Sequence, residues 1–314
     1  MSTTKVLLHL SQAQAPLTHE VSAINELGEF VKVSIPAERA LTLYVDKREL
    51  VTLMTLGAHP ELLVLGYLLN QRLITGPDAI ESITVDWDVG AAAVKTRHGI
   101  ADLEEKTSKR VVTTGCGQGS VFGGLMDEVD QIKLPIHAGM TQSQLYALVN
   151  TIRLKETTYK SAGSVHACAL FDATGTEPDM LMFVEDVGRH NAIDTIAGWM
   201  AINSTPTLVA SRTALPPEGA LRLQPGKAGS AAPAEKGTTP SHLVFYTTGR
   251  LTSEMVIKSA QMGVPIVVSR SGITQMGHQV AQSVGLCAIG RATNKRFIAY
   301  TGLQRLVLQP ALIA

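Results

Sequence analysis

Cys116 is the residue of this chain with the clearest chemical potential, because it lies in the glycine-rich stretch VVTTGCGQGSVFGG at residues 111–124. Five glycines fall between Gly115 and Gly124. Glycine allows backbone angles and close approaches that other residues do not. Backbone N–H groups that converge on sulfur stabilise a thiolate, the nucleophilic form of cysteine. The stretch therefore predicts a reactive thiol on a pliable loop, with a small buried cysteine beneath a turn as the alternative.

Composition limits the class of protein. The 314 residues suggest one large domain or two smaller ones. The three cysteines, Cys116, Cys168 and Cys287, are widely spaced and odd in number, which fits a reducing compartment rather than a disulfide framework. We expect a cytoplasmic location and, without a Cys-x-x-Cys pair, no tightly bound metal. A formal net charge of zero without a basic run argues against nucleic acid as a partner. No apolar run of about 18 residues predicts a membrane span.

The C-terminal third alternates between strand and helix patterns. We expect strands at 243–247, 265–269 and 286–289, with helices at 253–262 and 274–284 between them. Short strands that alternate with helices of about ten residues predict parallel pairing through crossover connections. Ligands bind such sheets beyond the carboxyl ends of the strands, here the segments TTGR, SRSG and GR that follow each strand. Each segment places a small or hydroxyl residue beside an arginine, which favours an anionic ligand over ordinary loop chemistry.

The remaining elements complete a two-part chain. Alternating apolar residues at 41–56 predict two strands around a turn at 46–49, and Thr141 and Gln144 form a capping box before a helix at 141–155. We expect a poorly ordered tail at 1–28, an N-terminal subdomain with the Cys loop at 29–140, and a C-terminal subdomain at 141–314. The Pro-, Gly- and Ser-rich segment 215–240 predicts a flexible insertion in the latter.

Two further polar motifs admit several interpretations. The cluster EDVGRHN at 185–191 could position a ligand, line a subunit contact, or simply join a strand end to a helix cap. His166 and Cys168 lie in a strand pattern like that of zinc deaminases, but the glutamate and the Pro-Cys-x-x-Cys ligands of those enzymes are absent. A cysteine hydrolase would need His166 or His190 as the base for Cys116, and nothing in the sequence fixes that geometry.

Together these segments resemble the formate dehydrogenase accessory sulfurtransferase family, FdhD/NarQ. The resemblance covers most of residues 30–308 except the 215–240 insertion. It depends on TTGCG at 113–117, GSVHA at 163–167, EDVGRHNAID at 185–194, TGRLTSEM at 248–255, SRS at 269–271, and the tail around Gly290, Arg291, Tyr300 and Thr301.

The resemblance implies a cytidine-deaminase-like α/β fold without the zinc site, with a mixed sheet, flanking helices and two subdomains, in a homodimer. It implies a sulfurtransferase that takes persulfide sulfur from a cysteine desulfurase onto Cys116. The sulfur would go to the bis-molybdopterin guanine dinucleotide cofactor, bound as substrate, to activate formate dehydrogenase. Its cofactor-binding residues fall on the C-terminal segment and one arginine-bearing loop: Leu286, Cys287, Ala288, Ile289, Gly290, Arg291, Gly249 and Arg250.

One departure from the family concerns the cysteine loop itself. The family usually carries Gly-Cys-Gly-x-Cys-Gly, whereas here Gly119 replaces the second cysteine. A disulfide within the loop is therefore impossible. Two functions remain open: a sulfur carrier that uses Cys116 alone, and a non-catalytic chaperone that binds the molybdenum cofactor without moving sulfur. Whether Cys168 or Cys287 supplies the missing thiol is open as well.

Overall fold

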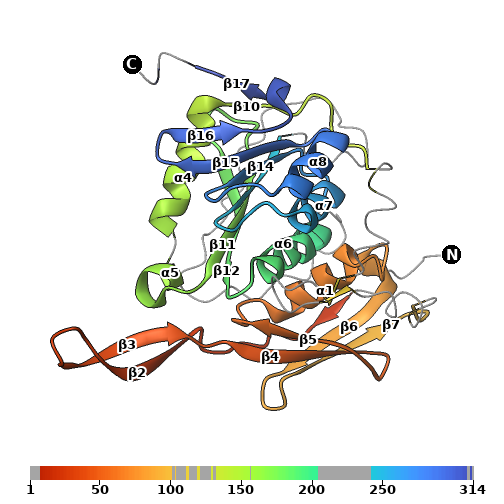
Figure 1. Ribbon diagram of the computed structural model, residues 1–314. Coiled ribbons are helices and arrows are strands. Elements are labelled where there is room, and N and C mark those ends of the chain that lie inside the picture. The colour runs from red at the N-terminus through yellow and green to blue at the C-terminus, as the bar shows by residue number, and fades with distance from the viewer. Residues whose placement is uncertain are drawn as a thin grey trace.

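The computed structural model describes residues 8–100, 103, 111–112, 119–120, 129, 132–155, 157–203, 242–309 and 312. They form two bodies, each built around its own sheet (Figure 1). Cys116 and the 215–240 insertion lie outside the described residues, although the short strands on either side of Cys116, β8 (Val111–Val112) and β9 (Gly119–Ser120), pair with each other. No described helix combines the length and the apolar character that crossing a membrane requires.

The N-terminal body is a five-stranded sheet with one helix against it. The strand order is β1-β6-β7-β4-β5. The predicted hairpin at 41–56 is confirmed, but its turn contains only Asp46 and Lys47, both with positive φ, as two-residue hairpin turns require. The elements are β1 (His9–Leu10), β4 (Arg39–Val45), β5 (Arg48–Thr55), α1 (Pro60–Asn70), the 3-10 turn η1 (Pro77–Ala79), β6 (Ile80–Asp86) and β7 (Ala91–Thr96).

The C-terminal body is a three-layer structure around a six-stranded mixed sheet, ordered β12-β11-β13-β14-β15-β16. The strands β13, β14 and β15 run parallel, which confirms the predicted alternation, and the outer strands pair antiparallel. The strands are β11 (His166–Asp172), β12 (Asp179–Asp186), β13 (Leu243–Thr247), β14 (Ile266–Ser269), β15 (Cys287–Thr293) and β16 (Arg296–Ala299). A mixed α/β architecture is thus confirmed, while the cytidine-deaminase-like label stays a prediction.

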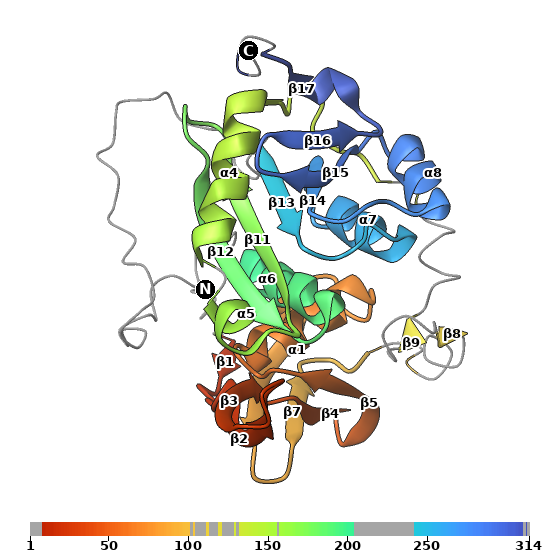
Figure 2. The same ribbon diagram turned by 60° about the vertical axis from the view of Figure 1, so that its left-hand side comes forward.

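Helices cover both faces of this sheet, as the turned view also shows (Figure 2). One face packs against α6 (Arg189–Asn203), α7 (Ser253–Gln261) and α8 (Gln275–Ser283), and the other against α4 (Gln142–Lys155). Alternate residues of each strand enter the two cores, because successive side chains of a strand point to opposite faces. The capping box that begins α4 is confirmed: Thr141 Oγ1 accepts from the Gln144 N–H at 3.2 Å, and Gln144 Oε1 accepts from the Thr141 N–H at 2.8 Å.

The two bodies meet where α1 crosses α6. A methyl group added to Gly66 of α1 would collide with the carbonyl of Asp194, and one added to Gly198 of α6 would collide with the carbonyl of Leu62. The helices therefore approach to backbone contact, which only glycine permits at these positions. Figure 1 shows this crossing between the two sheets.

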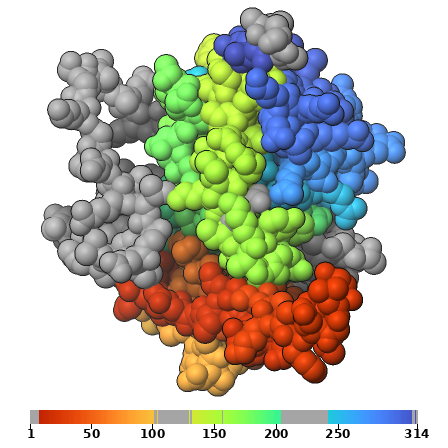
Figure 3. Space-filling view, turned by 90° about the vertical axis from the view of Figure 1, so that its left-hand side faces the viewer, coloured from red at the N-terminus to blue at the C-terminus, as the bar shows by residue number. Residues whose placement is uncertain are grey.

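Two boundaries differ from those expected from the sequence. The segment 1–28, expected to be poorly ordered, contains β1 and β2 (Thr18–Ile24), and β2 pairs with β3 (Phe30–Pro36) in a hairpin below α5 (Thr157–Ala162), as Figure 3 shows. Its partner strand lies beyond residue 28, so the composition of the tail alone did not indicate it. Val129, Leu134 and Met140, placed in the N-terminal subdomain, pack in the cores of the C-terminal body. There β10 (Met140–Thr141) pairs with β17 (Leu306–Val307), after the 3-10 turn η4 (Leu303–Arg305).

Candidate functional site

The strand register brings several sequence motifs to one edge of the C-terminal sheet. His166 lies opposite Asp186, Cys168 opposite Thr247, and Thr247 beside Ser269. The carboxyl ends of β12, β13 and β14 therefore meet the start of β11, and α6, α7 and α8 begin from the loops that follow. We call this place the arginine edge, because the strand ends, loops and helix start that meet there carry Arg189, Arg250, Arg270 and Arg291. The predicted convergence of the arginine-bearing loops is confirmed.

The hydroxyl groups at these strand ends hold the loops together. Ser269 Oγ donates to the carbonyl of Gly249 at 2.7 Å and accepts from the N–H of Ser271 at 2.9 Å. Thr247 Oγ1 accepts from the N–H of Gly249 at 3.0 Å. These bonds fix the backbone around the edge, so the hydroxyl groups position the loops.

The predicted binding residues divide into two groups. Gly249, Arg250, Gly290 and Arg291 lie at the arginine edge, and both of these arginines are exposed. The other four have fully buried side chains that enter the cores on either face of the sheet: Leu286, Cys287, Ala288 and Ile289. Their side chains cannot contact a ligand in this arrangement. Within the predicted binding segment 286–291, the structure therefore leaves the end at Gly290 and Arg291 as the part where a side chain could contact a ligand.

Arg189 is a residue of the edge that the sequence did not single out. It begins α6, it is only 6% exposed, and its Nε has no hydrogen-bond partner in the part of the chain that the structure describes. The side chain lies across Gly249, where an added methyl group would come within 2.5 Å of Arg189 Cδ. The only signal in the sequence was its place in the EDVGRHN cluster, whose interpretation was open.

The other members of that cluster have structural partners. Glu185 accepts from the backbone N–H groups of Thr158 and Tyr159 at 2.8 and 3.1 Å, and so caps α5. Asp186 accepts from the N–H of Leu56 at 3.1 Å and the side-chain amide of Asn191 at 2.7 Å, and thereby ties the end of β5 to α6. Burial raises the pKa of Asp186, against these hydrogen bonds. The cluster thus combines a joint between the bodies with one arginine, Arg189, that has no ion pair among the described residues.

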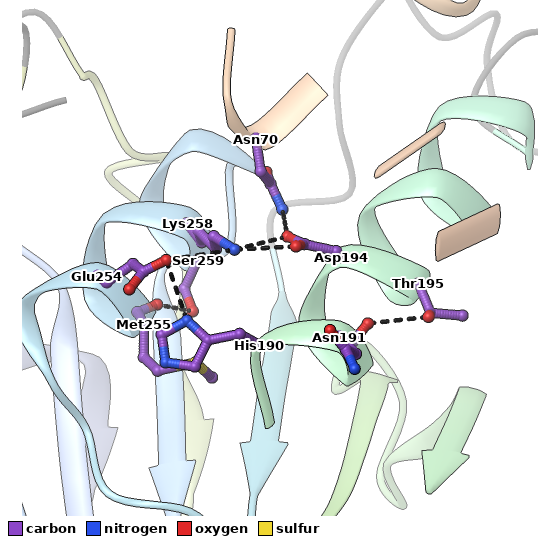
Figure 4. Close-up of polar contacts among 9 residues, drawn as sticks. All are labelled: Asn70, His190, Asn191, Asp194, Thr195, Glu254, Met255, Lys258 and Ser259. Carbon is purple, nitrogen blue, oxygen red and sulfur yellow. Dashed lines mark hydrogen bonds and ion pairs between the residues drawn. The ribbon is translucent and has the colours of Figure 1, made fainter. Parts of the chain in front are cut away.

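A buried charge network surrounds Lys258 (Figure 4). Lys258 of α7 is fully buried, with its Nζ 2.9 Å from Asp194 and 3.5 Å from Glu254. Asn70 of α1 donates to Asp194 at 2.7 Å, and His190 Nδ1 lies 3.0 Å from Glu254. We call these five residues the lysine network. It joins α1, α6 and α7, and because His190 follows Arg189, it fixes the start of α6 at the arginine edge.

The pKa shifts in the lysine network follow from burial and pairing. Burial alone would lower the pKa of Lys258, but Asp194 and Glu254 outweigh burial and raise it. Burial alone would raise the pKa of Glu254, but Lys258 and the hydrogen bond to His190 lower it to about 2. Burial also raises the pKa of Asp194, against the attraction of Lys258. Lys258 and Glu254 are charged at neutral pH, so the ion pair between them persists.

His166 reports the electrostatics of the arginine edge. Burial lowers its pKa, and the positive charges of Arg189, His190 and Arg250 lower it further. Its Nδ1 lies 3.3 Å from Thr248 Oγ1. His166 is therefore a neutral histidine beside a positive edge. Among the described residues, no group of three His, Cys, Asp or Glu side chains could hold a metal ion.

The two described cysteines are unreactive thiols. Cys168 is fully buried in β11 and donates to Thr247 Oγ1 at 3.3 Å, and burial raises its pKa to about 12. Burial also raises the pKa of Cys287 in β15 to about 12. A thiol with such a pKa supplies almost no thiolate at neutral pH. Neither residue can serve as the second thiol that the cysteine loop lacks.

The architecture places this chain in the class of mixed α/β proteins, in which ligands bind beyond the carboxyl ends of the strands. Comparison with known proteins gives the family. A family model described as the FdhD/NarQ family matches residues 36–214 and 228–307, and the chain belongs to this family.

Curated relatives match along nearly the whole chain. The sulfur carrier protein FdhD of Bacillus subtilis (strain 168) is 29% identical over 289 residues, which cover 90% of this chain and 94% of that protein. The protein of the same name from Listeria innocua is 25% identical over 285 residues, 90% of this chain and 95% of that one.

A solved structure has the same fold. It is a crystal structure, described provisionally as a formate dehydrogenase accessory protein from Desulfotalea psychrophila, with a TM-score of 0.63 and 18% sequence identity. The match covers 93% of this chain and 100% of the other. At this level of identity the likeness supports the architecture given above.

Proposed function

We propose that this protein is a sulfur carrier that receives persulfide sulfur on Cys116 from a cysteine desulfurase. It delivers this sulfur to a guanine-nucleotide-containing molybdenum cofactor during maturation of formate dehydrogenase. The relatives from Bacillus and Listeria bear the name sulfur carrier protein. The resemblance of the loop and edge motifs to the same family supports the donor, the cofactor, the homodimer and the cytoplasmic location as parts of this proposal.

The observation that carries the proposal is the state of the other two cysteines. Cys168 and Cys287 are buried in strands, with the pKa of each thiol raised to about 12. A carrier needs a thiolate that a partner protein can reach. If sulfur travels on a cysteine of this chain, Cys116 is therefore the residue that carries it.

The transfer onto Cys116 needs one thiolate and no added oxidant. The Cys116 thiolate attacks the outer sulfur of the donor persulfide, the donor S–S bond breaks, and a new S–S bond forms on Cys116. The donor cysteine leaves as a thiolate, so one sulfur atom moves without net oxidation or reduction. Because Gly119 replaces the second cysteine of the loop, no neighbouring thiol expels this sulfur by forming a disulfide. We therefore expect a longer-lived persulfide than in a relative with two loop cysteines.

The mass of the intact protein tests the transfer. After incubation with a cysteine desulfurase and cysteine, the wild type should gain the mass of one sulfur atom, and Cys116→Ala should gain none. The matched control is Cys287→Ala, which removes a cysteine but should still gain one sulfur atom. A wild type whose mass does not change would overturn the proposal.

Complementation separates the carrier from the alternative of a cofactor-binding chaperone. In cells that lack the native protein, Cys116→Ser should fail to activate formate dehydrogenase if the sulfur passes through Cys116. Full activation by Cys116→Ser would instead support a chaperone that binds the molybdenum cofactor at the arginine edge and transfers no sulfur.

A further inference from the structure

We infer that Arg189 is the anchor for a phosphate group at the arginine edge. This inference rests on the proposed function in one respect, the choice of a guanine nucleotide as the ligand. The first step of the argument is burial. Arg189 is 6% exposed, and within the described residues its guanidinium has no ion pair and its Nε no hydrogen bond. A buried charge without a partner is costly, so natural proteins rarely retain one unless a bound ligand supplies the missing partner.

The second step is the contrast with Arg305, another buried arginine of the same body. Arg305 is 7% exposed, and its guanidinium donates to three backbone carbonyls: Gly285 at 3.1 Å, Pro135 at 2.5 Å and Ala138 at 3.3 Å. The fold therefore supplies acceptors to a buried arginine whose role is structural. Arg189 receives no such acceptors among the described residues. Asp186, three residues before it in the chain, has both carboxylate oxygens engaged by other donors.

The third step is the position of the Arg189 side chain. Arg189 begins the 15-residue helix α6, whose N-terminus favours negative charge, and its side chain lies under the loop at Gly249. The positive charges of Arg189 and Arg250 both lower the pKa of His166, so both act at the start of β11. A planar guanidinium presents paired N–H groups that match two phosphate oxygens. Arg189 is thus a fixed binding group, while the exposed Arg250 and Arg291 are adjustable charges at the rim.

Binding of three probes to the full chain tests this assignment: GDP, inorganic pyrophosphate and guanosine, titrated by calorimetry. Arg189→Met should weaken GDP binding at least about 30-fold, because it removes a desolvated charge partner. Arg250→Gln should weaken it less than about fivefold, because that side chain is exposed and screened. Pyrophosphate binding should depend on Arg189 as well if the phosphate is the anchored group, and guanosine binding should not change.

The melting temperature distinguishes a ligand-binding arginine from a structural one, because loss of a structural arginine should lower it. Removal of an unpartnered buried charge should leave the melting temperature of the ligand-free protein unchanged or raise it by a few degrees. Arg305→Met is the matched control: it should lower the melting temperature by several degrees and leave GDP binding unchanged. Gly249→Ala offers a second test without loss of charge, because its methyl group displaces Arg189 and should weaken GDP binding.

Each outcome decides one question. A wild type that binds neither GDP nor pyrophosphate, or an Arg189→Met protein that binds both as the wild type does, overturns the inference and leaves sulfur carriage on Cys116 untouched. A melting temperature that falls in Arg189→Met as far as in Arg305→Met also overturns it, because the side chain would then be structural. Absence of sulfur on Cys116 of the wild type, with GDP binding still dependent on Arg189, refutes the carrier and keeps the anchor.

Discussion

Lys258 and Arg189 are two buried cations of the same body, and their surroundings are opposite. Lys258 is fully buried, with two carboxylates within 3.5 Å, and Asn70 and His190 engage those carboxylates in turn. Arg189 lies one residue from that network, is 6% exposed, and has no ion pair among the described residues. The fold thus supplies ion-pair partners to the buried charge of Lys258 but, among the described residues, none to that of Arg189.

The difference shows how the fold separates stability from binding. A buried ion pair adds little net stability, but removal of one partner leaves a costly uncompensated charge. The lysine network therefore fixes the relative positions of α1, α6 and α7. The arginine edge does the reverse, because a group that lacks a partner in the free protein gains one when a ligand binds. The predictions below test whether the lysine network is structural and whether unpaired groups at the arginine edge are dispensable for stability.

The largest effect is expected from Lys258→Met. The substitution keeps most of the side-chain volume but leaves Asp194 and Glu254 buried beside each other without a cation. We expect a loss of about 3–5 kcal/mol in the free energy of unfolding, measured with urea. Lys95→Met is the control, because the Lys95–Glu81 pair is exposed and should contribute less than about 1 kcal/mol. Equal losses in the two variants would show that the lysine network has no special structural role.

The pH dependence of stability sharpens the same point for Glu254. Its pKa is about 2 in the folded protein, below its ordinary value of 4.5, so the unfolded state binds the proton more readily. The stabilisation is complete above about pH 4.5 and is lost as the pH falls through 2. Glu254→Gln should therefore be less stable than the wild type by up to about 3 kcal/mol at neutral pH. The gap should narrow in unfolding titrations between pH 4.5 and 2, and a constant gap would refute the ion pairing of Glu254.

A smaller loss is expected where Asp186 joins the two bodies. Its two carboxylate oxygens accept from four donors, which include the hydroxyl of Thr55 and the N–H of Leu56. Asp186→Asn supplies one oxygen and turns an NH₂ group toward donors, so it should cost about 1–3 kcal/mol. Asp172→Asn, at the half-buried end of β11 where the carboxylate accepts from the Thr174 N–H, serves as the control and should cost much less. A hydrogen-exchange measurement should show that β5 loses protection in Asp186→Asn, and unchanged protection would argue against a joint at this position.

Much of the C-terminal fold could be predicted from local patterns. The strand at Leu243–Thr247 and the helices α7 and α8 were expected because apolar periodicity and turn residues both marked them. The β2–β3 hairpin and the packing of Val129 and Leu134 were not, because they depend on partners distant in the sequence. Local pattern cannot indicate which distant segment completes a strand or a core.

The sequence predicted the exposed arginines of the site but not its buried one. The convergence of Arg250 and Arg291 followed from the parallel order of the strands, which the sequence indicated. The lack of a partner for Arg189 among the described residues did not, because Asp186, three residues away, accepts from other donors such as Leu56. Those contacts exist only in the folded chain. The burial of four predicted binding residues was missed as well. They resemble a binding motif, but successive strand side chains enter the two cores in turn: Leu286, Cys287, Ala288 and Ile289.

The smallest effect on stability is expected from two threonines at equivalent positions, which again compare a polar group that has a partner with one that lacks a partner among the described residues. Thr252 and Thr274 are the N-caps of α7 and α8. Thr274 Oγ1 accepts from the N–H of Gly277 at 3.1 Å, whereas the buried Oγ1 of Thr252 has no hydrogen-bond partner among the described residues. Thr274→Val should cost about 1 kcal/mol, because a cap bond is lost.

Thr252→Val should cost nothing or stabilise slightly in thermal unfolding, because it removes a buried hydroxyl that lacks a partner. If both substitutions cost the same, Thr252 is an ordinary cap whose contribution to stability equals that of Thr274. If only Thr274→Val destabilises, Thr252 resembles Arg189: a polar group at the arginine edge that the free protein leaves without a partner, beside the loop that carries Arg250.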